Sequence, residues 1–328
     1  MTSFTSAARQ LTRQTGLAVR DARVVGSQHG YQHLMLTLAG SRRAFAKVAT
    51  ESRAGAPGDA PAQTAPGDAP AQTAPGDAPA QTAPGDAPAQ TAAAFAAEAS
   101  GLRWLAEADA VPVPEVLAVT ETALVISMIS PGPATPSAAF RFGAELAQLH
   151  ATGAEAFGAS WRGFIASLPL DNTPAPAGTP WPQWYASRRL QPYLEMAVDS
   201  GALRRQDAQL VEAVIDRIDS LAGPPEPPSR IHGDCWAGNV LWSGDRGWLI
   251  DPAAHGGHRE TDLAMLALFG APSLDRILVG YNDAIPLAAG WRSRVPLHQL
   301  HPLLVHACLF GPSYREGVRS AAREALSA

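Results

Sequence analysis

The first part of the chain alternates apolar and polar residues in a way that predicts one short helix and then several strands. In residues 5–15, Ala8 and Leu11 fall on one side and Gly16 follows as a stop signal, which predicts an amphipathic helix. Strand-like runs come next, separated by turn-forming residues. They lie at residues 23–25, 33–38, 43–49, 113–117 and 123–128. Five such runs predict a small antiparallel sheet.

Helical spacing dominates the rest of the chain. The clearest helix is predicted at residues 208–221, where apolar residues recur every three or four positions, Asp207 can cap the start and Gly223 ends it. Further helices are predicted at residues 94–108, 142–150, 184–198, 263–269 and 297–310. The pattern therefore predicts an α+β fold with two lobes, a small N-terminal lobe at residues 1–130 and a larger, mainly helical C-terminal lobe at residues 131–328.

Three polar residues surround one predicted hairpin in the second lobe. Residues 240–250 contain two short apolar runs around a turn rich in Gly and Asp, which predicts a hairpin. Asn239 precedes the outgoing strand, Asp251 follows the returning strand, and Asp234 lies on the loop before them. Their oxygen atoms should converge at one end of the hairpin, as suits Mg²⁺. Kinases use the same arrangement: a loop Asp positions the acceptor hydroxyl, while an Asn and a later Asp hold the metal. The alternative is a metal-free polar hairpin.

A second pair of charged residues lies in the first lobe. Lys47 shares one face of a predicted strand with Phe45 and Ala49, because side chains alternate along a strand. Glu98 falls on the apolar stripe of the helix predicted at residues 94–108. A carboxylate on a buried face needs a cation as partner. We therefore predict that Glu98 pairs with Lys47, an arrangement that holds ATP phosphates in kinases.

Two further segments could contact a nucleotide. Gly26 and Ser27 begin a turn between the first two predicted strands, where backbone N–H groups could approach phosphate. Met128 and Ile129 lie at the exit from the predicted sheet, where backbone groups could meet an adenine. His150, on a predicted helix, is expected to be a structural residue with satisfied hydrogen bonds.

Between the Lys47 strand and the Glu98 helix lies a repeat. Residues 56–91 are four copies of Ala-Pro-Gly-Asp-Ala-Pro-Ala-Gln-Thr. This composition lacks large apolar side chains and cannot build a core. We therefore expect residues 53–92 to form a disordered surface insertion, which a loop tolerates because closure entropy grows slowly with length.

Composition narrows the possible partners and the compartment. The 328 residues are 46% hydrophobic and 17% charged with a net charge of −5. Four of these negative charges belong to the repeats, so the remainder is almost neutral and gives no sign of a nucleic-acid or membrane partner. No apolar run approaches membrane-spanning length. The two cysteines, Cys235 and Cys308, are too few for a disulfide framework, so a cytoplasmic protein is expected and Cys235 is interpreted as a buried, inert residue.

Several motifs together resemble the fructosamine/ketosamine-3-kinase family of the protein-kinase-like, aminoglycoside-phosphotransferase-like superfamily. His-Gly-Asp-Cys-Trp-Ala-Gly-Asn at residues 232–239 is similar to the family's HGDLWxGN, and Asp-Pro-Ala at 251–253 matches its DPA. Residues 189–192, 257–264 and 309–315 resemble its RLxP, GHxExDLA and FGxxYR segments. The resemblance spans nearly the whole chain outside residues 50–93.

The resemblance implies a protein-kinase-like bilobal fold and an ATP- and Mg²⁺-dependent transfer of phosphate to the C3 hydroxyl of a ketosamine, the reaction that leads to protein deglycation. It implies that Asp234 is the base, that Asn239 and Asp251 hold the metal, and that Lys47 and Glu98 hold the phosphates. Trp236 and His306 would contribute to the sugar-amine pocket. Two departures are the repeat insertion and the absence of a cysteine in the segment at residues 26–31, where the family often carries one linked to redox control.

Two other functions compete with this one. An aminoglycoside- or choline-type phosphotransferase would use the same chemistry with another pocket; Pro252 and Ala253 and the balanced charge disfavour it. A non-catalytic binding protein of kinase fold would usually have lost at least one of four residues, and none is lost here. These residues are Lys47, Asp234, Asn239 and Asp251. The sequence does not define the preferred ketosamine, free or protein-bound, or the oligomeric state.

Overall fold

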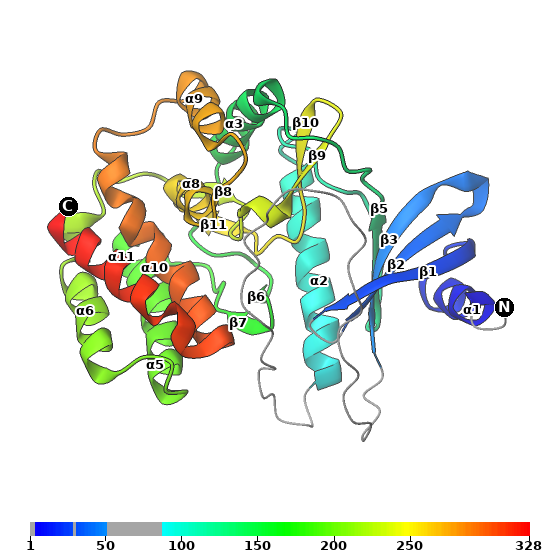
Figure 1. The fold of residues 1–328 in the computed structure, drawn as a ribbon, viewed down its shortest axis with the longest axis horizontal. Coiled ribbons are helices and arrows are strands. Elements are labelled where there is room, and N and C mark those ends of the chain that lie inside the picture. Colours follow the sequence, from blue (N-terminus) through cyan, green and yellow to red (C-terminus); the bar gives the residue numbers. More distant parts are fainter. Residues whose placement is uncertain (1–3, 29–30, 51–86) are drawn as a thin grey trace.

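The computed structural model describes residues 4–28, 31–50 and 87–328. Most of the repeat segment, residues 56–86, lies outside the described residues, and so does the turn at residues 29–30. Figure 1 shows two groups of elements: a sheet with one helix on the N-terminal side and a larger helical group on the C-terminal side. The connection between them, from the last strand of the sheet to the next helix, runs through residues 128–135. The predicted lobe boundary at residue 130 falls within it.

The N-terminal group is a five-stranded antiparallel sheet, as predicted. Its spatial order is β1-β2-β3-β5-β4, and the strands span Val19–Gln28, Tyr31–Leu38, Arg43–Ala49, Val116–Val119 and Ala123–Ser127 for β1 to β5. The first strand is longer than expected. It extends through Gly26 and Ser27, with an irregularity in the pairing between Val24 and Gly26, so these residues lie in a strand rather than in an open turn.

The two faces of the sheet pack against different helices. Helix α1 (Phe4–Thr15) buries Ala8 and Leu11 together with Ala44 and Ala46 of β3, and the chain then turns at Gly16, whose φ is 73°. The opposite face meets helix α2 through Phe95 and the strand residues of β5. Because side chains alternate along β3, Lys47 lies on the α2 side.

Helix α2 (Ala87–Ala106) begins earlier than expected. The sequence predicted a start at residue 94 and disorder up to residue 92, but the last five residues of the fourth repeat form its first turn. Gln90 Nε2 donates a hydrogen bond to the carbonyl oxygen of Ser167 at 2.9 Å, so this turn contacts the C-terminal lobe. The prediction of disorder is therefore wrong for residues 87–92. In Figure 1, α2 stands between the sheet and the helical group.

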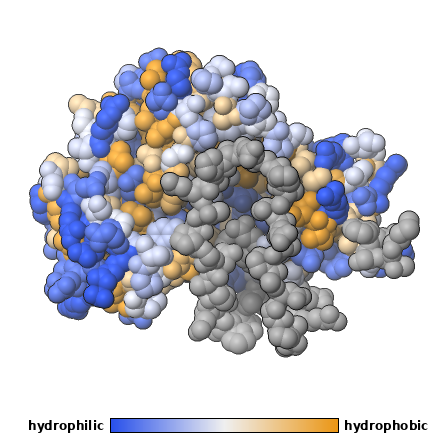
Figure 2. All heavy atoms as spheres, in the orientation of Figure 1, coloured by the Kyte–Doolittle hydropathy of each residue, from blue (hydrophilic) through white to orange (hydrophobic). Residues whose placement is uncertain are grey.

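The C-terminal lobe is mainly helical, as predicted. Its helices are α3 (Pro136–Ala151), α4 (Trp181–Tyr185), α5 (Gln191–Asp199), α6 (Arg205–Asp216), α7 (Ile218–Leu221), α8 (Arg259–Leu268), α9 (Leu274–Ala284), α10 (Trp291–Phe310) and α11 (Arg315–Ser327). Helices α9 and α11 were not predicted. The single helix predicted at residues 184–198 is instead α4, a π-helical turn (Ala186–Leu190) and α5. In Figure 2, hydrophilic side chains cover the outer surface over α5, α6 and α11.

Asp207 is not the N-cap residue of α6; it is the third helical residue and completes a capping box with Arg204. The helix begins two residues earlier, at Arg205, and the Asp207 carboxylate accepts a hydrogen bond from the Arg204 backbone N–H at 2.9 Å. It also forms an ion pair with Arg315 at 2.6 Å. The acidic residue therefore lies inside the first turn and joins α6 to α11, which explains why the predicted cap position is wrong.

Short strands complete the lobe. Strands β9 (Val240–Ser243) and β10 (Arg246–Leu249) form the predicted hairpin. Two further antiparallel pairs were not predicted: β6 (Gly163–Ile165) with β7 (Leu168–Leu170), and β8 (Ser229–Ile231) with β11 (His255–Gly257). Among the described residues, no helix is both long and apolar enough to cross a membrane.

Candidate active site

The loop at residues 232–238, named here the catalytic loop, and the β9–β10 hairpin bring Asp234, Asn239 and Asp251 together. Asn239 ends a short 3₁₀ turn directly before β9, and its Nδ2 donates hydrogen bonds to the backbone oxygen and to Oδ2 of Asp234, both at 2.9 Å. The same nitrogen lies 3.5 Å from the backbone oxygen of Asp251. Asp251 has a φ of 52°, a left-handed conformation that is uncommon for a residue with a side chain. The convergence expected from the hairpin is therefore present.

Asp262 fixes the loop that carries Asp234. Its two carboxylate oxygens accept hydrogen bonds from the backbone N–H groups of His232 and Gly233, at 2.7 and 2.9 Å. His150 Nε2 lies 3.2 Å from the same carboxylate, and His150 Nδ1 lies 2.7 Å from the Tyr281 hydroxyl. His150 is thus a buried structural residue, as expected. The role of Asp262 was missed, because nothing in local spacing connects it to a loop thirty positions upstream.

Lys47 joins the two lobes at the site. Its ammonium lies 2.9 and 2.8 Å from the two carboxylate oxygens of Glu98, as the strand and helix patterns predicted. It also lies 2.8 Å from Oδ1 of Asp251, which was not predicted. The Lys47 and Glu98 side chains are 11% and 14% exposed, whereas the Asp251 side chain is 42% exposed. The buried ion pair thus borders a carboxylate that solvent and ligands can reach.

Helix α2 contacts the segment after Asp251 directly. A Cβ atom placed on Gly101 would lie 3.2 Å from Cβ of Ala254 and 3.3 Å from Cγ of Pro252. The missing side chain at residue 101 therefore allows the helix to approach this segment closely. Because Glu98 lies almost one turn away on the same helix, this contact sets its position relative to Asp251. Sequence reasoning missed Gly101, since a glycine inside a helical pattern gives no sign of its neighbour.

The charges of the site alter the ionisation of its members. Burial raises the pKa of Asp234 to about 7; the Asn239 hydrogen bond opposes this shift, and the negative charges of Asp251 and Asp262 add to it. Burial opposes the charged form of Lys47, but Glu98 and Asp251 outweigh it and raise the lysine pKa. A carboxylate with a pKa near neutrality is suited to take a proton from a hydroxyl, because general bases work best near the operating pH.

The donor set fits a hard divalent cation. All the hydrogen bonds of the Asn239 side chain leave from Nδ2, so Oδ1 is the atom that can bind a metal. Asp251 can offer its second carboxylate oxygen, Oδ2, since Oδ1 contacts Lys47. Amide and carboxylate oxygens are the ligands that Mg²⁺ takes in phosphate-handling sites. Asn239 and Asp251 are thus the residues that could hold Mg²⁺.

The predicted nucleotide contacts lie at the ends of two strands, the edge strand β1 and the inner strand β5. Gly26 and Ser27 are exposed at the end of β1. Met128 and Ile129 follow β5, and the Met128 N–H donates to the Arg43 carbonyl oxygen at 3.3 Å. The Met128 N–H is therefore already used within the protein. A hinge contact with adenine would have to rely on the Met128 carbonyl or on the backbone of Ile129.

The two residues assigned to the sugar-amine pocket both lie next to Phe269. Trp236 is 39% exposed, and its ring centroid lies 6.0 Å from that of Phe269. The Phe269 ring in turn lies 5.0 Å from the His306 ring. Phe269, at the end of α8, thus bridges the two predicted residues. It was missed because a lone aromatic residue at a predicted helix end is usually part of a core.

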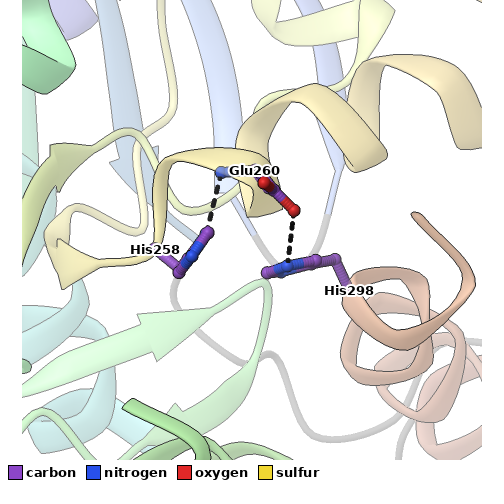
Figure 3. Close-up of side chains that lie close together, drawn as sticks. All are labelled: His258, Glu260 and His298. Carbon is purple, nitrogen blue, oxygen red and sulfur yellow. Dashed lines mark hydrogen bonds and ion pairs between the residues drawn. The ribbon is translucent and has the colours of Figure 1, made fainter. Parts of the chain in front are cut away.

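A second cluster of possible metal ligands is structural. His258, Glu260 and His298 lie close together and are buried, and the His298 ring faces the Glu260 carboxylate (Figure 3). However, the Arg294 guanidinium contacts both Glu260 oxygens, at 2.9 and 2.5 Å. His258 Nδ1 accepts the hydrogen bond of the Glu260 N–H that begins α8. A cation there would displace an arginine that already neutralises the carboxylate, so the cluster is best explained as an anchor between α8 and α10.

Cys235 is fully buried, and burial raises its thiol pKa well above the usual range. Thiolate reactivity requires the opposite shift. The expectation that Cys235 is buried is therefore confirmed, and the raised pKa agrees with an unreactive thiol. Cys308 is also a free thiol, and burial raises its pKa to about 12.

A small antiparallel sheet, a helix whose glutamate binds a strand lysine, and an Asp-Asn-Asp site on a loop and hairpin together define a protein-kinase-like phosphotransferase. Solved structures agree with this class. A candidate fructosamine-3-kinase of Thermobifida fusca is 46% identical, with a TM-score of 0.82 over 98% of this chain and 99% of the other. The gentamicin complex of the aminoglycoside phosphotransferase APH(2")-IIa has a TM-score of 0.57 at 12% identity, over 100% of this chain and 97% of the other, and shows the fold alone.

The chain belongs to the fructosamine kinase family, whose model matches residues 86–328. A probable ketoamine kinase of Klebsiella aerogenes is 34% identical over 230 residues, which cover 69% of this chain and 78% of the relative. The probable ketoamine kinase YniA of Escherichia coli is 33% identical over 216 residues, covering 64% and 73%. The protein is thus an ATP-dependent kinase, and the resemblance noted in its motifs is confirmed.

Proposed function

We propose that this kinase transfers the γ-phosphate of ATP, with Mg²⁺, to the sugar C3 hydroxyl of ketosamines. The observation that carries the proposal is the chain of contacts that joins Lys47, Asp251, Asn239 and Asp234, in that order. A binding protein of kinase fold would have no reason to keep this set intact. The names of the curated relatives, probable ketoamine kinases, support the acceptor class.

Each residue has a distinct part in this proposal. Asp234 orients the acceptor hydroxyl and accepts its proton, because its pKa of about 7 allows both protonation states near neutral pH. Lys47, held by Glu98, binds phosphate oxygens of the nucleotide. Asn239 and Asp251 hold Mg²⁺, which when bound neutralises the charge that develops on the transferred phosphate. Asn239 also keeps the Asp234 carboxylate in place through its Nδ2 hydrogen bond.

The acceptor class follows from the surroundings of the base. Trp236 lies two residues after Asp234 and exposes a flat apolar ring that can cover one face of a short sugar. We propose that ribulosamines are better substrates than fructosamines and that the amine side of the substrate extends out of the cleft. The C3-phosphorylated product decomposes and releases the free amine. Because ATP is the phosphate donor and both cysteines are free, we propose a cytoplasmic location.

The deciding experiment measures ATP consumption with ribulosyl-lysine, fructosyl-lysine, choline and a panel of aminoglycosides, followed by NMR of the product. The expected result is turnover of both ketosamines, faster for the ribulose adduct, with phosphate on the sugar C3 oxygen. Turnover of aminoglycosides or choline alone, or phosphate on another hydroxyl, would assign the protein to the competing class. A protein that binds ATP but turns over no acceptor on the panel would contradict the proposal.

A further inference from the structure

A row of aromatic rings leads away from the catalytic loop. It consists of Trp236, Phe269, His306, Phe310 and Tyr314, named here the aromatic strip. The His306 ring lies 5.0 Å from Phe269, 4.8 Å from Tyr314 and 5.5 Å from Phe310, centroid to centroid. Tyr314 and Phe310 are 5.7 Å apart. The strip therefore runs continuously from the residue beside the base to the junction of α10 and α11.

Four separate segments build the strip. Trp236 comes from the catalytic loop, Phe269 from the end of α8, and His306 and Phe310 from α10. Tyr314 lies in the turn before α11. Trp236 is exposed, and the other four side chains are only partly buried. An aromatic cluster that served only as core would be closed to solvent, as are the rings of Tyr185 and Tyr193 in the same lobe.

The strip carries no charge. His306 Nδ1 lies 2.7 Å from the Pro302 carbonyl oxygen and so carries the ring proton, and burial lowers the His306 pKa, which keeps the ring neutral. Arg315, the next residue after the strip, is directed to Asp207 at 2.6 Å. In the described part of the chain, the cation–π contacts involve other rings. Among the described residues, the strip thus offers aromatic faces and no charged side chain of its own.

Trp236 is fixed at the start of the strip. A Cβ atom on Gly238 would lie 2.3 Å from the Trp236 ring, so the ring lies directly over the glycine of the catalytic loop. The absence of a side chain at residue 238 allows this position. Asp234, which binds the acceptor hydroxyl, and Trp236, the first ring of the strip, are therefore held in one rigid loop.

We propose that the aromatic strip binds the amine-side group of the acceptor and selects ketosamines whose amine carries a flat apolar group. The inference rests on the proposed function, since it requires a sugar hydroxyl at Asp234. The amine lies on C1, two carbons from the reacting C3 hydroxyl, so a substituent on it leaves the sugar site past Trp236. An aromatic substituent then stacks on Trp236 and Phe269, whereas a short polar substituent such as ethanolamine gains no such stacking contact. Offset aromatic pairs favour such a contact by up to about tenfold in affinity.

The test compares three ribulosamines that differ only in the amine: ribulosyl-phenethylamine, ribulosyl-cyclohexylethylamine and ribulosyl-ethanolamine. The expected kcat/KM is about five- to tenfold higher for the phenethylamine adduct than for the ethanolamine adduct, with the cyclohexyl adduct between them. The difference should lie in KM, because the strip is distant from the reacting oxygen. Equal kcat/KM for the three adducts would overturn the proposal and leave the ketosamine kinase activity intact.

Substitutions at Phe269 separate a binding role from a structural one. Phe269→Leu removes the ring, and we expect the phenethylamine preference to fall to about twofold or less. Phe269→Tyr keeps the ring and should keep the preference. Phe140→Leu, which removes a ring on α3 that contacts Arg276, is the matched control and should not change the ratio. A ratio that is unchanged in Phe269→Leu would contradict the inference. Failure of all three adducts as substrates would instead contradict the proposed function, and the inference with it.

Discussion

Asp234 is held in an environment that opposes its charged form. Burial raises its pKa to about 7, against 3.8 for an ordinary aspartate. The folded protein therefore binds more protons than the unfolded chain between about pH 4 and pH 7. In this window the free energy of unfolding decreases as pH rises, and the full loss of stability is present above pH 7. The proposed base thus destabilises the fold at neutral pH.

The substitution Asp234→Asn tests both the role of the carboxylate in catalysis and its effect on stability. The amide keeps an oxygen for the Asn239 Nδ2 hydrogen bond and removes the charge. We expect kcat to fall at least about 100-fold, since general bases contribute about 10²–10⁴. At pH 8 the variant should be more stable by about 1–2 kcal/mol, a discounted value for a partly exposed group, and the difference should vanish near pH 4.

Two measurements check this prediction: initial rates, and thermal melting of both proteins from pH 4 to pH 8. The kcat/KM of the natural enzyme should also rise with pH through about 7 as Asp234 loses its proton. A fully active variant would exclude Asp234 as the base. A stability difference that does not depend on pH would show that its carboxylate is not held in an unfavourable environment.

Which site residues sequence reasoning could find depended on how local their pattern was. Asp234, Asn239 and Asp251 lie within eighteen positions, and the hairpin between the last two is itself a local pattern. Lys47 and Glu98 were found because a charged residue on an apolar face requires a partner. Asp262 and Phe269 make contacts across the fold, and no spacing in the sequence predicts these contacts.

Helices α3 and α9 pack backbone to backbone at two glycines. A Cβ atom on Gly143 of α3 would lie 2.0 Å from the Ile277 carbonyl oxygen, and one on Gly280 of α9 would lie 2.0 Å from the Phe140 carbonyl oxygen. Such close approach is possible only without side chains. Helix α3 also supports the hairpin, because its Phe142 ring packs against Trp242 at 5.7 Å between centroids. The two glycines therefore set the position of the elements beneath the active site.

Replacing Gly280 with alanine should separate the two helices. The backbone oxygen cannot move aside as a side chain can, so we expect a loss of about 3 kcal/mol or more and a melting temperature lower by roughly 6 °C or more. Gly132→Ala is the control, because a Cβ there would make ordinary contacts at 3.6 Å or more. Differential scanning calorimetry decides the matter: equal melting temperatures for the two variants would refute the close packing of α3 and α9.

The short strands that the sequence did not predict share a physical cause. Strands β6, β7, β8 and β11 have three residues each, too few for a period-two pattern to emerge. Helix α6 was predicted to start too late because Asp207 matches a cap preference but is engaged by Arg315. Several longer helices and strands were predictable because burial on one side sets their periodicity. Helices α9 and α11 have such a pattern too and were overlooked.

At the scale of the molecule, α2 connects the two lobes and also receives the repeat segment. Its first turn is repeat sequence, and Gln90 donates to Ser167 in the other lobe. We therefore expect most of the repeat to be dispensable for stability and activity, whereas residues 87–91 are needed. A deletion of all four copies and a deletion of three should therefore differ.

Deleting residues 56–82 keeps the fourth copy and with it the start of α2. We expect the melting temperature to change by no more than about 2 °C and kcat/KM by no more than about twofold, because the deleted residues carry no core-forming side chain. Deleting residues 56–91 also removes Gln90 and the first turn. This variant should melt several degrees lower and bind ATP more weakly, since α2 positions Glu98. Identical behaviour of the two deletions, measured by melting and steady-state kinetics, would exclude a role for this turn.

The start of α2 inside a repeat has a consequence for inheritance. All four copies end in the same Ala-Pro-Ala-Gln-Thr, so whichever copy adjoins the helix supplies an identical first turn and an identical glutamine. Tandem DNA repeats gain and lose whole units when the strands misalign during replication. Such an event shifts the junction by nine residues and restores the same residues at the same place. The gene can therefore lengthen or shorten here from one lineage to the next. Because the start of α2 stays the same, we expect such a change to be neutral for catalysis.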